Sequence, residues 1–60
     1  MRVRVDYQAD AVYLDLNNNA IESSEAVTDG IILDYDKAGN LVGIEILDAS
    51  KKAGSLDALR

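Results

Sequence analysis

The sequence predicts a mainly β, α+β fold in one small domain, residues 1–60: a single antiparallel β-meander sheet of about four to five strands with a short C-terminal helix. Three observations predict it. Apolar and polar residues alternate from the start of the chain, clusters of Asn, Asp and Gly separate the alternating segments, and the C-terminal residues change to helix-forming types. We expect residues 51–60 to be a frayed helix or tail.

The first two strands are predicted from alternation with a period of two, which places successive side chains on opposite faces of a sheet. Val3, Val5 and Tyr7 fall on one parity, and charged residues stand between them. After the polar break QAD (8–10), the segment AVYLDL (11–16) resumes the same alternation. We therefore expect two consecutive strands joined by a short turn.

A third, polar strand is predicted between two turns. The segment NNNA (17–20) is a turn, since asparagine tolerates the left-handed backbone conformation and bonds its own main chain. In IESSEAV (21–27), the odd-numbered residues would form one face of a strand, and of these only the first, Ile21, and the last, Val27, are apolar. This pattern favours an edge strand. The segment TDG (28–30) predicts the second turn.

The strongest strand pair is IILDYD (31–36) with NLVGIEIL (40–47), which flank the turn DKAG. A type I turn with Gly39 in the left-handed bulge position would pair Asp36 with Asn40. From that pair onward, the numbers of paired residues sum to 76.

This register predicts that both faces of the hairpin are apolar. One face would carry Ile32, Val42, Ile44 and Ile46 beside Asp34, and the other Ile31, Leu33, Tyr35, Leu41 and Leu47, with Gly43 and Glu45 among them. A sheet with one wet side alternates cleanly, so a second apolar face indicates a second layer, subunit or partner. The candidate interface residues are Tyr35, Leu41, Glu45, Leu47, Leu56 and Leu59.

The segment DASKKAGSLDALR (48–60) predicts the terminal helix. Asp48 or Ser50 would be its N-cap, because their side-chain oxygens accept hydrogen bonds from the free N–H groups of the first turn. Leu56 and Leu59, three residues apart, give the helix a thin apolar stripe.

The stretch DYDKAGNLVGIE (34–45) resembles an EF-hand calcium loop, with acidic residues at its first, third and twelfth positions and glycine at its sixth. Both flanks, however, are predicted strands, and Glu45 would lie roughly 16 Å along the strand from Asn40. We therefore interpret the stretch as a β-hairpin and predict no metal site and no cofactor. Asp34 and Asp36, beside the turn, are the candidates that remain for weak divalent-metal binding at this hairpin.

The length of the chain predicts association. Burial of apolar surface stabilises a fold by about 25 cal/mol per Å², and ordering the chain costs roughly 1.5 kcal/mol per residue. For so short a chain the two terms nearly cancel, which leaves a net stability near zero. The sequence has no cysteine and no histidine, which excludes disulfides and argues against a zinc site. We expect a homodimer, since two-fold pairing is the commonest closed assembly.

The composition also limits function and location. Six basic and eleven acidic residues give a net charge of −5, which phosphates would repel, so we expect no nucleic-acid binding. No apolar run approaches the roughly 20 residues that span a bilayer, and we predict a cytoplasmic protein without membrane contact. Without histidine or cysteine, the usual base and the best nucleophile are missing, so we expect no enzyme.

Polar residues within the predicted strands have functional and structural interpretations. Glu45 is either a general acid–base group or interface anchor, or a structural residue that pairs with Arg2, Arg4 or a lysine or is simply exposed at a sheet edge; we favour the structural interpretation. Asp10 is interpreted as a turn former that bonds its own backbone, and Asp15 as a solvated strand residue. The three tyrosines are either interface hot spots or ordinary strand residues with hydroxyls in water, and we favour the ordinary interpretation.

Two blocks of the sequence resemble a known family. These are ADAVYLDL (9–16) and DGIILDYDKAGNLVGIEILDAS (29–50). They resemble the small prokaryotic family called domain of unknown function 2283, whose members carry Y-D-x-x-A-D-A-L-Y-I and D-x-x-G-x-x-x-G-I-E-I-L-x-A-S. The second block matches at Asp36, Gly39, Gly43, Ile44, Glu45, Ile46, Leu47, Ala49 and Ser50. In the first block Val5 stands where the family usually has an aromatic residue.

The resemblance implies no activity, cofactor or catalytic residue, but it does imply an antitoxin-like role, as a partner of a small toxin, for some members. Our leading hypothesis is a protein of unknown function that acts by protein–protein association, dimeric and antitoxin-like, with a small basic protein as partner. The alternative is a small-ligand or weak divalent-metal binder that uses Asp34, Asp36 and Glu45. A third alternative, an enzyme, is disfavoured and would need a pocket lined by Glu45 with a second carboxylate.

Overall fold

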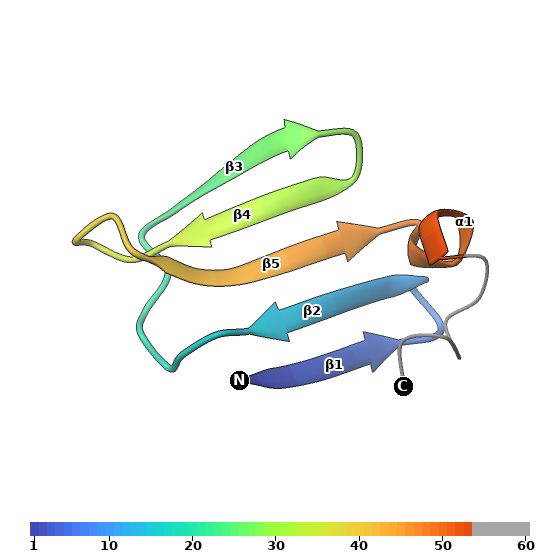
Figure 1. Ribbon diagram of the computed structural model, residues 1–60, viewed down its shortest axis with the longest axis horizontal. Coiled ribbons are helices and arrows are strands. Elements are labelled where there is room, and N and C mark those ends of the chain that lie inside the picture. Colours follow the sequence, from blue (N-terminus) through green and yellow to red (C-terminus); the bar gives the residue numbers. More distant parts are fainter. Residues whose placement is uncertain (54–60) are drawn as a thin grey trace.

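The computed structural model describes residues 1–53, which form one antiparallel sheet with a short helix at its end (Figure 1). The elements are β1 (Arg2–Asp6), β2 (Ala11–Asp15), β3 (Ser23–Thr28), β4 (Ile31–Tyr35), β5 (Leu41–Leu47) and α1 (Ala49–Ala53). The predicted fold class is confirmed. The predicted apolar stripe of Leu56 and Leu59 lies outside the described residues. Within residues 1–53, no helix is long and apolar enough to cross a membrane.

The strands lie in the order β1-β2-β5-β4-β3 across the sheet. The β1–β2 hairpin and the β3–β4–β5 meander meet where β2 pairs with β5, and residues 16–22 cross to the far edge (Figure 1). An uninterrupted meander would place β3 beside β2. The observed order instead puts the most apolar strand in the centre and the polar strands β1 and β3 at the edges, where polar side chains disfavour aggregation. The polar edge strand predicted over 21–27 is confirmed as β3, whose six residues are all exposed.

Pairing divides the side chains into two surfaces, because directly paired residues lie on the same face of a sheet. Ile44 of the central strand pairs with Leu14 on one side and with Leu33 on the other. We call this face the apolar sheet surface; it carries Val3, Val5, Val12, Leu14, Ile31, Leu33, Ile44 and Ile46. The opposite face is the polar sheet surface; it carries Arg2, Arg4, Tyr13, Asp15, Ser24, Ile32, Asp34, Gly43, Glu45 and Leu47.

The turn predicted between the last two strands is confirmed. Gly39 has a φ of 83°, in the left-handed region that glycine adopts without strain. Its N–H donates to the carbonyl of Asp36 at 3.0 Å, and the N–H of Asp36 donates to the carbonyl of Asn40 at 2.9 Å. The connection is therefore the type of turn followed by a glycine that commonly closes hairpins.

The predicted register is right for the first pair after this turn and wrong beyond it. Asp34 pairs with Gly43 rather than with Val42, because a β-bulge inserts Val42 as an extra residue in β5. The carbonyl of Val42 accepts a hydrogen bond of 2.9 Å from the N–H of Leu16, which follows β2. The bulged residue is thus bonded to a distant part of the chain, which the hairpin sequence does not contain.

The bulge separates residues that were predicted to share a face. Tyr35 and Leu41 pair with each other in line with the apolar sheet surface, whereas Glu45 and Leu47 belong to the polar one. Glu45 instead lies on the same face as Asp34. The prediction that both faces of the hairpin are apolar is therefore wrong: one face is apolar, and the other carries the carboxylates Asp34 and Glu45 between Ile32 and Leu47.

The buried core of the described residues is small. Ala49, Val12 and Val42 are 0%, 2% and 3% exposed, and within residues 1–53 no large side chain is fully buried. Val12 and Ala49 form one cluster at the end of the sheet, where α1 contacts β2. The helix covers this end, and among residues 1–53 the rest of the sheet is a single layer (Figure 1).

The start of α1 is capped by a residue from the opposite end of the chain. The carboxylate of Asp10 accepts hydrogen bonds from the backbone N–H of Ser50 at 3.0 Å and from its hydroxyl at 2.8 Å. The capping carboxylate thus belongs to neither predicted cap, Asp48 nor Ser50. The interpretation of Asp10 as bonding its own turn is wrong as well, because Asp6 does this, accepting from the N–H of Ala9 at 3.0 Å. Asp10 joins the β1–β2 turn to the helix.

Candidate functional site

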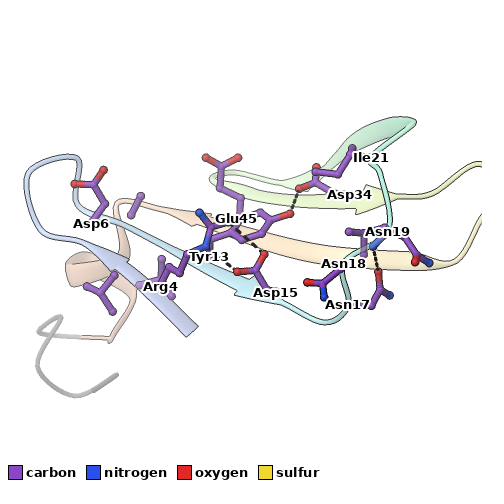
Figure 2. Close-up of a pocket in the computed structure, with 14 residues that line it drawn as sticks. Arg4, Asp6, Tyr13, Asp15, Asn17, Asn18, Asn19, Ile21, Asp34 and Glu45 are labelled. Atoms are coloured by element: carbon purple, nitrogen blue, oxygen red, sulfur yellow. Dashed lines mark hydrogen bonds and ion pairs between the residues drawn. The ribbon is translucent and has the colours of Figure 1, made fainter. Parts of the chain in front are cut away.

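A pocket of about 650 Å³ lies on the polar sheet surface. Its floor comes from β1, β2, β4 and β5, and the crossing segment around Asn18 forms one wall (Figure 2). This volume lies within the range of about 300–1,000 Å³ that small-molecule pockets occupy. Four carboxylates and one guanidinium line it, namely Asp6, Asp15, Asp34, Glu45 and Arg4. The pocket therefore has an excess of negative charge.

Tyr13 crosses the floor of this pocket to reach Asp34 (Figure 2). Its hydroxyl donates to one oxygen of the Asp34 carboxylate at 2.8 Å, and the hydroxyl of Ser24 donates to the other at 2.5 Å. Asp34 is only 6% exposed, so these two bonds replace most of its lost hydration. Burial, together with the bond to Asp34, raises the pKa of Tyr13 to about 12. The prediction that the tyrosine hydroxyls are in water is wrong for Tyr13.

Gly43 allows the ring of Tyr13 to lie flat across β5. A Cβ atom at position 43 would lie 2.6 Å from Cζ of Tyr13 and 2.9 Å from the carbonyl oxygen of Leu14, and it would overlap the Tyr13 hydroxyl. No side chain fits there without displacing the tyrosine. Glycine at this position is therefore required by a close approach between two strands.

Asp15 holds the two arginines of β1. Nε of Arg4 lies 2.7 Å and Nε of Arg2 lies 3.3 Å from the same carboxylate oxygen of Asp15, and the guanidinium of Arg4 lies 4.6 Å from the centre of the Tyr13 ring. The hydrogen bond from Arg4 is the main cause that lowers the pKa of Asp15. Asp15 is therefore not the solvated residue predicted, since cross-strand pairing brings both arginines to it.

Glu45 lies opposite Tyr13 and Ile32, and its carboxylate extends outward from the floor of the pocket (Figure 2). Of the structural alternatives for Glu45, the ion pair with Arg2 or Arg4 does not form, because Asp15 takes both arginines, and exposure at an edge does not apply, because β5 is the central strand. Within residues 1–53, the side chain of Glu45 forms no hydrogen bond and no ion pair. Its carboxylate is thus a charged group of the pocket that the described residues leave without a partner.

The crossing segment is fastened to the hairpin turn by asparagine side chains. Nδ2 of Asn17 donates to the carbonyl of Leu41 at 3.1 Å, and Nδ2 of Asn19 donates to the carboxylate of Asp36 at 2.9 Å. Asp36 also accepts from the N–H groups of Ala38 and Asn40, both at 2.9 Å. The bond from Asn40 contributes most to lowering the pKa of Asp36. Asp36 therefore holds two loops together.

The alternative metal ligands do not converge in one place. Asp34 and Glu45 share the polar sheet surface, but Asp36 lies at the turn with its oxygens bonded to the loops. Both oxygens of Asp34 accept hydrogen bonds from hydroxyls. Among residues 1–53, no group of three His, Cys, Asp or Glu side chains is placed to hold a metal ion.

With the fold and the pocket described, comparison with known proteins identifies the family. Residues 2–50 match the family described as "Protein of unknown function (DUF2283)", and the chain belongs to this family. It is 38% identical, over 52 residues, to "Uncharacterized protein MJ0789" of Methanocaldococcus jannaschii. That match covers 85% of this chain and 45% of the relative, so the chain spans less than half of the longer protein. No solved structure matches the chain significantly.

The structure accounts for most of the polar and glycine residues in the family blocks described above. Asp10 and Ser50, from different blocks, bind each other at the start of α1. Gly39 adopts a left-handed turn, and Gly43 leaves room for Tyr13. Glu45 is different, because within residues 1–53 it supports no other part of the structure.

Proposed function

We propose that this cytoplasmic protein acts by protein–protein association and that the apolar sheet surface is its binding element. One observation carries this proposal: a five-stranded sheet has one apolar face, and among residues 1–53 the helix covers one end of it and no other element packs on it. Six side chains on this face remain partly exposed, namely Val5, Leu14, Ile31, Leu33, Ile44 and Ile46.

The energy available on this surface is large for a chain of 60 residues. Complete burial of an aliphatic side chain contributes about 1.5–3 kcal/mol, so finishing the burial of a half-buried one contributes roughly 1 kcal/mol. For the six side chains this amounts to about 6 kcal/mol. A complete domain is stable by only about 5–15 kcal/mol. A covering partner would therefore change the stability of this protein by a large fraction.

Labelling of a single cysteine tests the proposal, because the sequence contains no natural cysteine. Leu33→Cys places a thiol on the apolar sheet surface, and Ile32→Cys places the control thiol next to it on the opposite surface. Both positions are partly buried in the same strand. In an extract of the host cells, we expect a thiol reagent to modify Leu33→Cys at least about tenfold more slowly, because a partner excludes the reagent.

In urea the two variants should react at the same rate, which controls for intrinsic reactivity. Equal rates in the native extract would mean that nothing covers the apolar sheet surface, and the proposal would be wrong.

A second candidate function, favoured by the pocket, is recognition of a basic group, as an antitoxin-like role with a basic partner would require. Four carboxylates against one guanidinium attract a cation, and Glu45 offers a carboxylate that no described residue occupies. We expect oligolysine to bind in calorimetry at low salt and Glu45→Gln to weaken binding about three- to tenfold. The control is Glu25→Gln, which removes the same charge from β3, outside the pocket. Equal weakening by both variants would indicate net charge rather than a site.

A further inference from the structure

We propose that the partner on the apolar sheet surface is a second copy of this chain, packed sheet against sheet about a two-fold axis. This inference rests on the proposed function, because it names the molecule that covers the same surface. It predicts a two-layer sandwich with the polar sheet surfaces outside.

The dimensions of the protein support this partner. The protein measures 34 × 22 × 15 Å, so the rectangle that encloses its broad side has an area of roughly 750 Å², of the same order as the about 800 Å² of accessible surface that each partner buries in a standard interface. Its thin dimension leaves room for one sheet layer and the helix. A second sheet stacked at about 10 Å would complete the two layers from which stable domains are built.

The side chains on this surface are suited to such packing. Valine, leucine and isoleucine alternate along every strand from β1 to β5 except the edge strand β3, and these residues fill the cores of β-sandwiches. In a two-fold dimer the apolar sheet surface of one copy meets the same surface of the other. Such a contact between apolar surfaces needs no charged group on the partner. The central strand β5 would place Ile44 and Ile46 near the centre of the contact.

The distribution of charge allows two acidic chains to approach. Each copy has a net charge of −5, but the register puts Arg4, Asp15, Asp34 and Glu45 on the opposite surface. Among the strand residues within 1–53, Glu25 of the edge strand is the only charged residue that pairs into the apolar side, opposite Leu33. At the rim of a sandwich this carboxylate would stay in water, where a charge costs little.

Pairing through the free edge of β3 is the alternative arrangement. It would extend the sheet into a longer one, but it would leave the apolar sheet surface of both copies exposed. Because β3 is polar and fully exposed, whereas the central strands are apolar, face-to-face packing removes far more apolar surface from water.

The test is the mass of the purified protein by sedimentation equilibrium, from about 1 to 100 μM, a range that spans common dimer affinities. We expect a species of twice the 6.5 kDa chain mass at the upper end of this range. Ile44→Lys introduces a charge into the contact in both copies, and we expect it to raise the dissociation constant at least about 100-fold. Ile32→Lys makes the same change on the opposite surface, beside Glu45, and should leave the dissociation constant within about threefold.

A dimer that withstands Ile44→Lys with its circular dichroism unchanged would overturn face-to-face packing and indicate the β3 edge. If Ile44→Lys does not fold, the wild-type protein decides, since a dimer has an unfolding midpoint that rises with protein concentration. A wild-type monomer at every concentration would overturn the second copy as partner. Protection of Leu33→Cys in the host extract would then still support association with another protein, whereas its absence would refute both proposals.

Discussion

Tyr13→Phe removes one hydroxyl from the polar sheet surface and tests the account of how that surface is held together. In the wild-type protein the hydroxyl donates to Asp34 at 2.8 Å, and Asp34 is 6% exposed. Phenylalanine keeps the ring over Gly43, so the change isolates the hydrogen bond from the packing. The carboxylate of Asp34 would then retain the bond from Ser24 and lose the other.

The hydrogen bond sets the size of the effect. Loss of a hydrogen bond to a charged group typically costs about 1.5–3 kcal/mol. The pKa of Tyr13, raised from 10.0 to about 12 by burial and then by the bond to Asp34, sets how much stability is lost when the phenol ionises, because two pKa units correspond to at most about 2.7 kcal/mol between the protonation states. Solvent screening at this partly exposed ring reduces that value. We therefore expect Tyr13→Phe to lower the free energy of unfolding by about 2 kcal/mol at neutral pH.

The pH dependence follows from the direction of the shift. Because the folded protein holds the Tyr13 proton more tightly than the unfolded chain does, the stabilisation is complete below pH 10 and is lost between pH 10 and about 12. The difference in unfolding free energy between wild type and Tyr13→Phe should be constant from neutral pH to about pH 9 and should then shrink. Lysine and the other tyrosines titrate in both proteins and cancel in this difference.

The assay is urea unfolding followed by far-ultraviolet circular dichroism, at one protein concentration because association contributes to stability. Tyr35→Phe is the matched control, since it removes a hydroxyl outside the pocket. A loss below about 0.5 kcal/mol, or parallel wild-type and variant curves up to pH 12, would refute the Tyr13–Asp34 bond as a stabilising link.

Three further predictions concern single contacts. Asp10→Ala should lower the free energy of unfolding by about 2–4 kcal/mol, because Ser50 loses two hydrogen bonds and the backbone φ of 53° at position 10 suits alanine poorly. In the same urea assay, Asp10→Asn should lower it by less than half as much. Gly43→Ala should lower the free energy of unfolding by about 2–4 kcal/mol, because the added methyl group displaces Tyr13. The pKa of Tyr13, followed by phenolate absorbance, should then fall from about 12 toward 10. An unchanged titration would contradict the close approach. The lowered pKa of Asp36 implies stabilisation that is present above the usual aspartate pKa of about 3.9 and is lost as the pH falls through the lower folded value. Asp36→Asn should therefore make the free energy of unfolding fall less steeply with decreasing pH on the acid side. An unaltered acid side would exclude this role of Asp36.

Local patterns in the sequence predicted the elements well. Alternation gave the strands, and the Asp36–Gly39 turn followed from the needs of a left-handed glycine. The same patterns did not predict the neighbours of each strand. That β5 lies between β2 and β4 depends on which strands bury the most apolar surface together, and alternation within one strand carries no such information.

Local sequence patterns also did not predict the partners of the polar side chains. Asp10 and Ser50 are 40 positions apart, and Tyr13 reaches Asp34 across 21 positions. The close approach of Tyr13 to β5 was not predicted; the one sequence feature that could have indicated it is Gly43, because glycine inside a strand often marks a close approach. Glu45 was noticed in the sequence as a carboxylate in an apolar strand, but its surface was predicted wrongly.

The sequence by itself determined the class of fold, the hairpin turn, the polar edge strand and the absence of thiol and imidazole chemistry, because each depends on composition or on residues adjacent in the chain. Only the tertiary structure decided which face each residue of the hairpin occupies. The insertion of Val42 shifts the pairing by one residue, and with a period of two this shift moves Glu45 to the side of Asp34 and leaves the other side wholly apolar. The contact that accompanies the bulge, from Leu16 to Val42, joins distant segments and exists only once the sheet has assembled.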